Sequence, residues 1–235
     1  MEWAEEFYSK QAAWSGIYTL DVSDYHRGKA SLLQALAGDS PKTVLELGAG
    51  GAQAAFATAE LGYHVTAIEL LPTSAAHAMT LSTRTRRGSL RVVQGDFYAV
   101  QADGPYDIVC YWDGFGIGQD EDQARLLRRM ARWLNRSGVV LLDIYSPWYW
   151  AKVAGRQMVF DTVMRRYGFD PAGNRMTVGG PSAARKTASP NPCGAIRRPI
   201  SSFYCAARDC ASSRMPQFRV GPWITTEGRT RNTWN

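Results

Sequence analysis

The sequence lacks a long apolar run. No stretch of the 235 residues reaches the ~18 apolar residues of a membrane-spanning helix, and residues 1–10 lack the apolar centre of a secretory signal. We therefore expect no membrane-embedded segment, and we predict a cytoplasmic location.

Cysteine and histidine are scarce, with four and three residues respectively. Cys110 stands alone in the body of the chain, and the other three cysteines lie beyond residue 190. Their spacings match no zinc motif, and no paired histidines support one. We therefore expect neither a metal site nor a disulfide framework.

Net charge is also nearly absent from most of the chain. Residues 176–235 carry nine Lys/Arg and two Asp/Glu, a net charge of +7, whereas the other 175 residues carry 18 and 19, a net charge of −1. The predicted helix of residues 120–134 has four arginines, which fit an RNA surface or, as its amphipathic pattern favours, a solvated face. We expect no nucleic-acid partner. The sequence carries no signal of oligomeric state.

The clearest motif is the segment Thr43–Gly51. An apolar run that contains one acidic residue suits a buried parallel strand, and it leads directly into glycines. Gly48 and Gly50 let the backbone turn tightly and approach a ligand closely. A helical pattern follows over residues 52–61, so its N-terminal N–H groups point toward that ligand. The motif predicts a cofactor loop.

The details of this loop separate two cofactors. A dinucleotide fingerprint requires Gly or Ala where this chain has Gln53. The pattern Glu46-x-Gly48-x-Gly50 instead resembles motif I of class I S-adenosylmethionine-dependent methyltransferases, whose third glycine falls here at Ala52. The resemblance implies that the methionine end of S-adenosylmethionine is held by Glu46, Gly48, Ala49 and Gly50.

The next two predicted strands are each followed or ended by residues that fit the ribose and adenine groups of the same cofactor. The strand of residues 64–70 ends near Glu69, which lies 23 residues after Glu46, close to the ~20 expected of a ribose-binding carboxylate. Leu70 would then lie against the adenine. After the strand of residues 90–93, the resemblance implies that Asp96 binds the adenine amino group and that Phe97 packs near the ring. Open α/β sheets bind ligands at these carboxyl ends.

A fourth strand, predicted over residues 106–111, leads into the expected acceptor side. Tyr111 is predicted to contact the cofactor, and Trp112 and Phe115 to line the acceptor pocket. Asp113 is predicted to orient or deprotonate the acceptor, or alternatively to begin a turn. The Asn/Asp-Pro-Pro-aromatic motif common in enzymes that methylate exocyclic amines of nucleobases is absent here.

Aromatic residues flank this region on both sides. Residues 1–36 predict two helices, on which Tyr8 and Trp14 either form a lid that contacts the acceptor or pack on the sheet. Arg27 either pairs with the methionine carboxylate or is solvated. Tyr145 and Trp148 follow the strand predicted over residues 139–144, and they fit an apolar acceptor or the core equally well.

Residues 178–235 do not continue these patterns. Pro, Ser and Arg are scattered through this segment, and its apolar residues follow neither a helical nor a strand period. This composition predicts an irregular basic tail. A reading frame that slipped near Thr177 is a more specific explanation, because the pairs Phe203–Tyr204, Tyr204–Cys205 and Asp209–Cys210 would each encode leucine in the shifted frame. We predict that this tail is out of frame.

Together these patterns predict an α/β fold with a doubly wound, mostly parallel, Rossmann-like sheet whose C-terminal strands are lost or replaced. We divide the chain into an N-terminal helical cap (1–38), an S-adenosylmethionine-binding α/β domain (39–177) and the tail (178–235). The resemblance implies methyl transfer by in-line displacement to a nitrogen, oxygen or carbon atom of a small molecule. The alternatives are an NAD-dependent oxidoreductase, a nucleic-acid methyltransferase that uses the tail, and a non-catalytic remnant that binds the cofactor.

Overall fold

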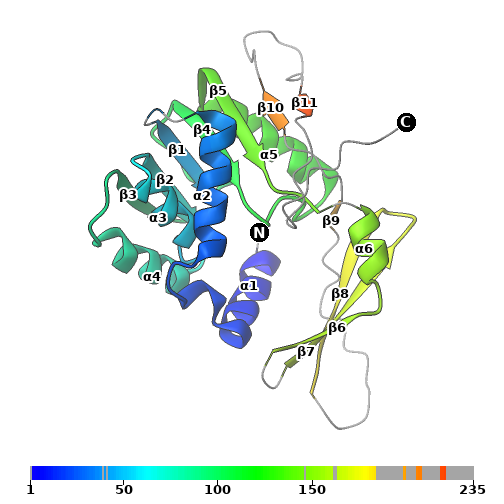
Figure 1. The fold of residues 1–235 in the computed structure, drawn as a ribbon. Helices are drawn as coiled ribbons and strands as arrows, with labels where there is room; N and C mark the ends of the chain where they lie inside the picture. The colour runs from blue at the N-terminus through cyan, green and yellow to red at the C-terminus, as the bar shows by residue number, and fades with distance from the viewer. Residues whose placement is uncertain are drawn as a thin grey trace.

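Five parallel strands form the central sheet of the computed structural model (Figure 1). The structure describes residues 2–38, 40, 42–145, 147–160, 163–183, 198–199, 205–207 and 218–220. The order of the strands is β3-β2-β1-β4-β5, so the chain reverses its direction of winding between β3 and β4. Their bounds are β1 (Thr43–Leu47), β2 (His64–Glu69), β3 (Ser89–Gln94), β4 (Tyr106–Tyr111) and β5 (Leu134–Leu142).

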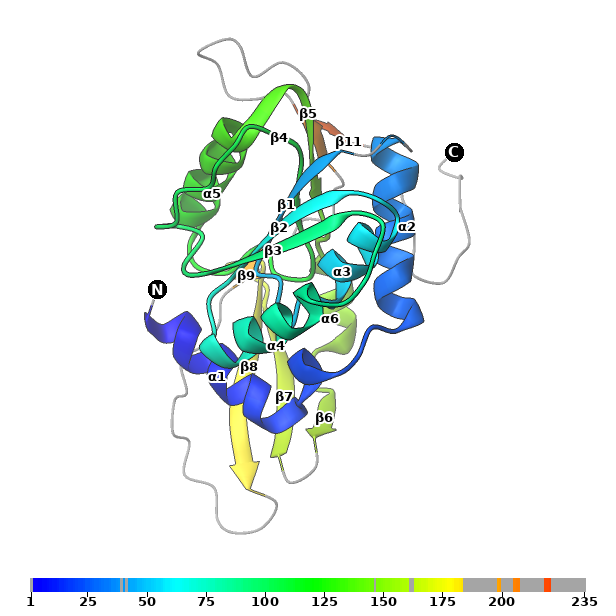
Figure 2. The same ribbon diagram turned by 90° about the vertical axis from the view of Figure 1, so that its left-hand side faces the viewer.

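Helices cover both faces of this sheet (Figure 2). One face carries α2 (Asp24–Ala37), α3 (Gln53–Glu60) and α4 (Pro72–Ser82), and the other carries α5 (Asp120–Trp133). Successive strand residues alternate between the two cores: Ile108 packs with the first layer and Val109 with the second. The doubly wound parallel fold predicted from the sequence is confirmed.

The fifth strand begins earlier than predicted. Its first residue, Leu134, pairs with Tyr106, and the register then shifts before Ile108 pairs with Val139. Asn135 donates a hydrogen bond to Asp107 in the neighbouring strand. These local pairings extend β5 over polar residues that lack a strand-like apolar pattern.

The N-terminal segment does not form one cap. Helix α1 (Glu2–Ser15) and the 3-10 turn η1 (Ile17–Thr19) lie over the carboxyl ends of the strands, and β4 and β5 contribute to the same core as Ala4. Helix α2 instead belongs to the helical layer, because its Leu33 is completely buried there. Thus only α1 and η1 stand apart from the main layers.

A second, antiparallel sheet follows the body. It contains β6 (Gln157–Phe160), β7 (Val163–Asp170), β8 (Arg175–Ala183) and β9 (Arg198–Pro199), and helix α6 (Pro147–Val153) packs on it. Trp150 of α6 contacts a small core that includes Met176 and Val178. Strand β8 therefore continues past residue 177, where we expected the binding domain to end, because its alternate residues are buried under α6.

Most of the expected tail lies outside the described residues. Of its later part the structure describes β9 and a short antiparallel pair, β10 (Cys205–Ala207) and β11 (Phe218–Val220), with β10 beside β5. Within the described part of the chain, no sixth strand is hydrogen-bonded to β5. The residues that carry the frame-shift argument fall largely outside the description, so that hypothesis stays a prediction.

Candidate functional site

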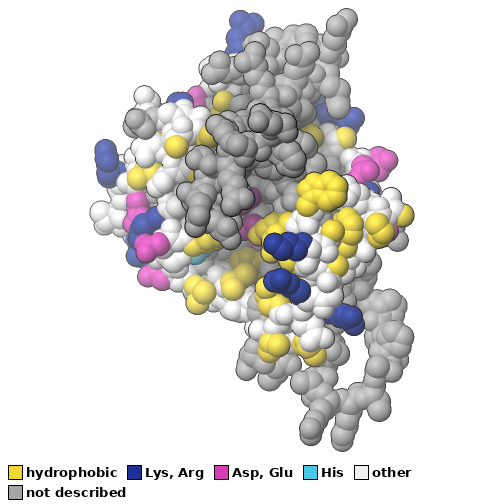
Figure 3. All heavy atoms as spheres, turned by 45° about the vertical axis from the view of Figure 1, so that its right-hand side comes forward, with side chains coloured by type: hydrophobic (Ala, Val, Ile, Leu, Met, Phe, Trp, Pro, Cys, Tyr) yellow, Lys and Arg dark blue, Asp and Glu magenta, His cyan; other side chains and the backbone are white. Residues whose placement is uncertain are grey.

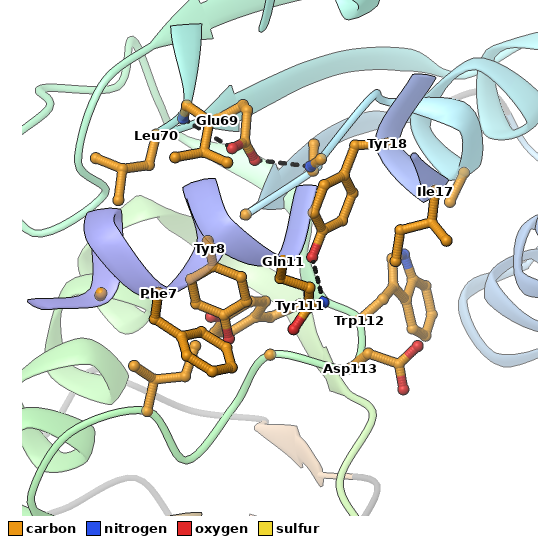
Figure 4. Close-up of a pocket in the computed structure, with 18 of the residues that line it drawn as sticks. Phe7, Tyr8, Gln11, Ile17, Tyr18, Glu69, Leu70, Tyr111, Trp112 and Asp113 are labelled. Atoms are coloured by element: carbon orange, nitrogen blue, oxygen red, sulfur yellow. Dashed lines mark hydrogen bonds between the residues drawn. The ribbon is translucent and has the colours of Figure 1, made fainter. Parts of the chain in front are cut away.

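A cavity of about 550 Å³ lies at the carboxyl ends of β1, β2, β3 and β4 (Figure 4). Helices α1 and α2 and the turn η1 contribute walls on one side, and α6, β7 and β8 contribute walls on another. Of the predicted site residues, the cavity is lined by Tyr8, Glu46, Gly48, Ala49, Gly50, Glu69, Leu70, Asp96, Phe97, Tyr111, Trp112, Asp113 and Tyr145.

The glycine loop after β1 is shaped by aromatic neighbours. Gly48 and Gly50 both have a φ of 57°, which favours glycine. A Cβ on Gly50 would lie 2.8 Å from the ring of Tyr18, and one on Gly51 would lie 1.9 Å from the carbonyl oxygen of Tyr18. The turn η1 therefore closes directly onto the loop, and glycine is needed because the two backbones touch.

Ala52 occupies a left-handed conformation. Its φ is 60°, and it precedes the first residue of α3. A non-glycine residue in this region costs about 1–2 kcal/mol. The family motif has glycine at this place for a reason that the backbone shows: the chain turns there into the helix.

Glu69 holds the loop from the end of β2. Its Oε2 accepts the backbone N–H of Gly50 at 2.7 Å, and its Oε1 accepts the N–H of Leu71 at 2.8 Å. Burial raises the pKa of this carboxyl group, and the backbone donors oppose the rise. One side chain thus joins the ends of β1 and β2 while it lines the cavity (Figure 4).

Glu46 supplies an acceptor that the described residues leave unused. The residue is 2% exposed, and burial raises its pKa to about 8. Its Oε2 makes no hydrogen bond of regular geometry within the described residues, although the indole of Trp112 lies beside the carboxyl group and opposes the rise of its pKa. Since a buried polar atom without a partner is costly, a ligand that carries an ammonium group fits this wall. The α-amino group of S-adenosylmethionine has that chemistry.

The cavity wall at the end of β3 is aromatic. Asp96 Oδ1 accepts the N–H of Tyr98 at 2.7 Å, which fixes the turn after β3. The ring of Phe97 lies 5.4 Å from that of Tyr111, centroid to centroid, in an edge-on arrangement. A flat apolar wall beside a carboxylate suits a purine with an exocyclic amino group.

The opposite end contains a charged cluster around Asp113. Its Oδ2 accepts hydrogen bonds from Lys29 Nζ at 3.0 Å and from the hydroxyl of Tyr25 at 2.8 Å. Tyr145 is also hydrogen-bonded to it. Burial raises the pKa of Asp113, but Lys29 outweighs this effect and holds the pKa below its usual value. Asp113 also has a left-handed backbone with a φ of 55°, so this residue forms the predicted turn and makes ionic contacts at the same time.

Four predicted site residues do not line the cavity. Arg27 points to the protein surface, where it pairs with Glu60 at 3.3 Å, because the other face of α2 meets the sheet. Phe115 packs in the core beside α5, and Trp148 is 81% exposed because α6 turns its neighbour Trp150 inward. Trp14 lies on α1 away from the lining residues. These four side chains lie off the cavity wall, and their contacts with cofactor or acceptor stay predictions.

Other lining residues were not predicted. Lys29 enters the cavity from α2, two residues after Arg27, and Gln53 of α3 donates to the carbonyl oxygen of Leu20 at 2.8 Å. Arg165 and Tyr167 enter from β7. The helical period of α2 could have indicated Lys29, whereas nothing in the sequence brings β7 to the end of β4.

None of the described helices is both long and apolar enough to cross a membrane. In the same residues, no group of three or more His, Cys, Asp or Glu side chains is arranged to hold a metal ion.

Known proteins share both the sequence motifs and the fold. Residues 44–138 match the family model described as a methyltransferase domain. A cypemycin N-terminal methyltransferase from a Streptomyces species is 31% identical over 116 residues, which are 48% of this chain and 46% of that protein. The chain therefore spans about half the length of this curated relative.

Two solved structures show the same fold. The methyltransferase CcbJ from Streptomyces caelestis has a TM-score of 0.58 at 17% identity, covering 79% of this chain and 81% of its own. An S-adenosylmethionine-dependent methyltransferase from Clostridium acetobutylicum has a TM-score of 0.55 at 13% identity, covering 74% and 72%. At these identities the two structures show a shared fold, and the methyltransferase-domain match covers residues 44–138 of this chain.

Proposed function

We propose that the chain transfers the methyl group of S-adenosylmethionine to a small-molecule acceptor. The observation that carries this proposal is the position of Glu69, whose carboxylate holds the glycine loop and faces the same cavity as Glu46 and Asp96. Three acids from three neighbouring strand ends match the amino, ribose and adenine groups of one ligand. The cofactor, when bound, supplies an electrophilic methyl group on a sulfonium.

The residues of the chain contribute mainly by holding the two reactants in line. Glu46 would bind the α-amino group, Glu69 the ribose hydroxyls, and Asp96 the adenine amino group. The aromatic walls of α1 and η1 exclude water above them. Such positioning can contribute roughly 7–11 kcal/mol toward lowering the barrier of a two-reactant step.

Calorimetric titration tests the cofactor site. S-adenosylmethionine and S-adenosylhomocysteine should bind with micromolar affinity, and NAD should not. Glu69→Ala should abolish the binding. Glu60→Ala, which removes an acid at the end of α3 outside the cavity, should retain it. Binding of NAD in place of the adenosyl ligands would favour the oxidoreductase, and a folded chain that binds neither would contradict the proposal.

The nucleic-acid alternative has little support. The basic residues concentrate in the tail, most of which lies outside the described residues. RNA affinity that persists after removal of residues 178–235 would favour a nucleic-acid methyltransferase. The cytoplasmic location and the out-of-frame tail stay predictions, and sequencing the coding DNA around codon 177 tests the latter.

A further inference from the structure

We propose that the methyl acceptor is an amine, and that Lys29, Asp113 and Asp143 form a cluster of net charge −1 that stabilises the positive charge left on its nitrogen. This inference rests on the proposed function and specifies its accepting atom. The three residues come from α2 and from the segments after β4 and β5. We call them the acceptor cluster.

The geometry of the acceptor cluster joins two carboxylates through one ammonium group. Lys29 Nζ lies 3.0 Å from Asp113 Oδ2 and 3.3 Å from Asp143 Oδ2. The side chains of Lys29, Asp143 and Asp113 are 11%, 29% and 40% exposed, so solvent screens the lysine weakly and the two carboxylates in part. Lys29 and Asp113 line the cavity, and Asp143 stands behind them.

The charge states leave an excess of one negative charge. Burial lowers the pKa of Lys29, but Asp113 and Asp143 outweigh burial and raise it above the usual value, so the ammonium stays protonated. The pKa of Asp113 is lowered and that of Asp143 is raised, the latter by burial and by Asp113. When both carboxylates are ionised, the two acids and one ammonium group give the cluster a net charge of −1, which attracts a cation.

Aromatic rings continue the same wall. Lys29 Nζ lies 5.4 Å from the ring centroid of Trp112, which is 8% exposed. The rings of Tyr145 and Trp150 are 5.1 Å apart, and that of Tyr167 lies 5.8 Å beyond. Ring faces beside a carboxylate bind alkylammonium groups well.

The cation Arg165 lines the same cavity from β7. It donates to Oε1 of Gln11 at 2.6 Å and lies 5.5 Å from the ring centroid of Phe7, on the side of α1. It also donates to the hydroxyl of Tyr167 at 3.5 Å, so it borders the far end of the aromatic wall. An anionic acceptor would bind beside Arg165, whereas an amine would bind beside the acceptor cluster.

The charge movement of the reaction distinguishes an amine from an oxygen anion. An ammonium acceptor first gives one proton to water. Its nitrogen lone pair then forms the N–C bond while the C–S bond breaks and sulfur keeps the electron pair, so the positive charge moves from sulfur to nitrogen. The acceptor cluster stabilises that nitrogen, whereas it would repel a phenolate or carboxylate nucleophile.

Binding of three phenyl compounds to the protein saturated with S-adenosylhomocysteine tests this inference. We expect phenethylamine at about pH 7.5 to bind at least about tenfold more tightly than phenethyl alcohol, and 3-phenylpropionate to bind most weakly. Asp113→Asn and Asp143→Asn should each reduce the preference for the amine to less than about threefold. Asp103→Asn, a surface carboxylate paired with Arg91, is the control that should leave it unchanged.

The outcomes separate this inference from the proposed function. If the adenosyl ligands do not bind, the proposed function fails. If they bind but the alcohol or the carboxylate equals the amine, or none of the three compounds binds, the amine inference is wrong. Asp143→Asn is decisive because Asp143 does not line the cavity, so a change in preference there reports charge and not lost contact.

Discussion

The two ends of the cavity are built by different means. The cofactor end is made of backbone turns and three acids from consecutive strand ends, all within residues 46–97. The acceptor end is made of side chains from α1, α2, the loop after β4, α6 and two strands of the antiparallel sheet. The first is encoded by short motifs, whereas the second exists only once distant segments meet.

This difference extends to the outer surface of the acceptor side. Figure 3 views the side on which α6 and the antiparallel sheet lie, and exposed hydrophobic side chains gather there beside Lys and Arg. They include Trp148 and Val159, which are 81% and 68% exposed. On the cofactor side, Ile17 and Leu20 at the turn η1 are 41% and 58% exposed.

The largest effect is expected where two backbones touch at the cofactor end. In Gly51→Ala the new methyl group would lie 1.9 Å from the carbonyl oxygen of Tyr18. We expect the affinity for S-adenosylhomocysteine to fall by more than about a hundredfold, because the clash displaces η1 from the loop.

The control is Gly28→Ala on α2, where an added Cβ would meet nothing within 4 Å. This variant should bind normally and be about 1 kcal/mol more stable, as alanine is in a helix. Full affinity in Gly51→Ala, measured by calorimetry, would show that η1 moves freely and that the loop does not need its glycine.

A smaller effect is expected from the ion pairs of the acceptor end. Lys29→Met leaves Asp113 and Asp143 without their shared cation, and the free energy of unfolding near pH 7 should fall by about 2–4 kcal/mol. Lys29 holds the pKa of Asp113 below its unfolded value, so this stabilisation exists above about pH 4 and is lost as the pH falls further.

Urea denaturation at several pH values checks this prediction. The difference between the wild type and Lys29→Met should shrink below about pH 4, and the exposed Lys152→Met should show no such difference. A difference that does not depend on pH would assign the loss to packing of the lysine stem and not to its charge.

Glu46 gives the cofactor end its own pH dependence. Its pKa is raised to about 8 by burial, so the protonated form stabilises the empty protein at low pH, and this contribution is lost as the pH rises toward 8. Glu46→Gln should therefore gain in Tm relative to the wild type between about pH 5 and 8.5.

Ligand binding should change in the opposite direction. The Glu46 carboxylate must be ionised to bind an ammonium group, so the affinity of the wild type for S-adenosylhomocysteine should exceed that of Glu46→Gln by about tenfold near pH 8, and by less near pH 6. A ratio that is constant with pH, measured by calorimetry, would place the α-amino group away from Glu46.

The smallest effect is expected at the end of the loop. Ala52→Gly relieves a left-handed residue, worth about 1–2 kcal/mol, and loses a buried methyl group, worth about 1 kcal/mol, so stability should change by less than about 1 kcal/mol. Ala55→Gly, equally buried but helical, should cost about 2 kcal/mol. Equal losses in thermal denaturation would show that Ala52 is not strained.

The sequence by itself determined the cofactor end and the class of fold. Glu46, Glu69 and Asp96 could be found because each lies in the last residues of an apolar strand or directly after it, and parallel strands present their carboxyl ends at one edge of a sheet. The glycine loop followed from the steric freedom that its conformation requires. These signals are local, and they do not depend on how the chain ends.

Only the tertiary structure decided the acceptor end. Lys29 and Arg27 lie two residues apart on one helix, and packing of α2 against the sheet turned one into the cavity and the other toward Glu60. The same holds for Trp150 and Trp148, of which α6 buries only the first. Lys29 and Asp113 are partners although they lie 84 residues apart in the sequence. The physical reason is that the packing of whole helices and sheets brings such residues together, and this packing leaves no local pattern in the sequence.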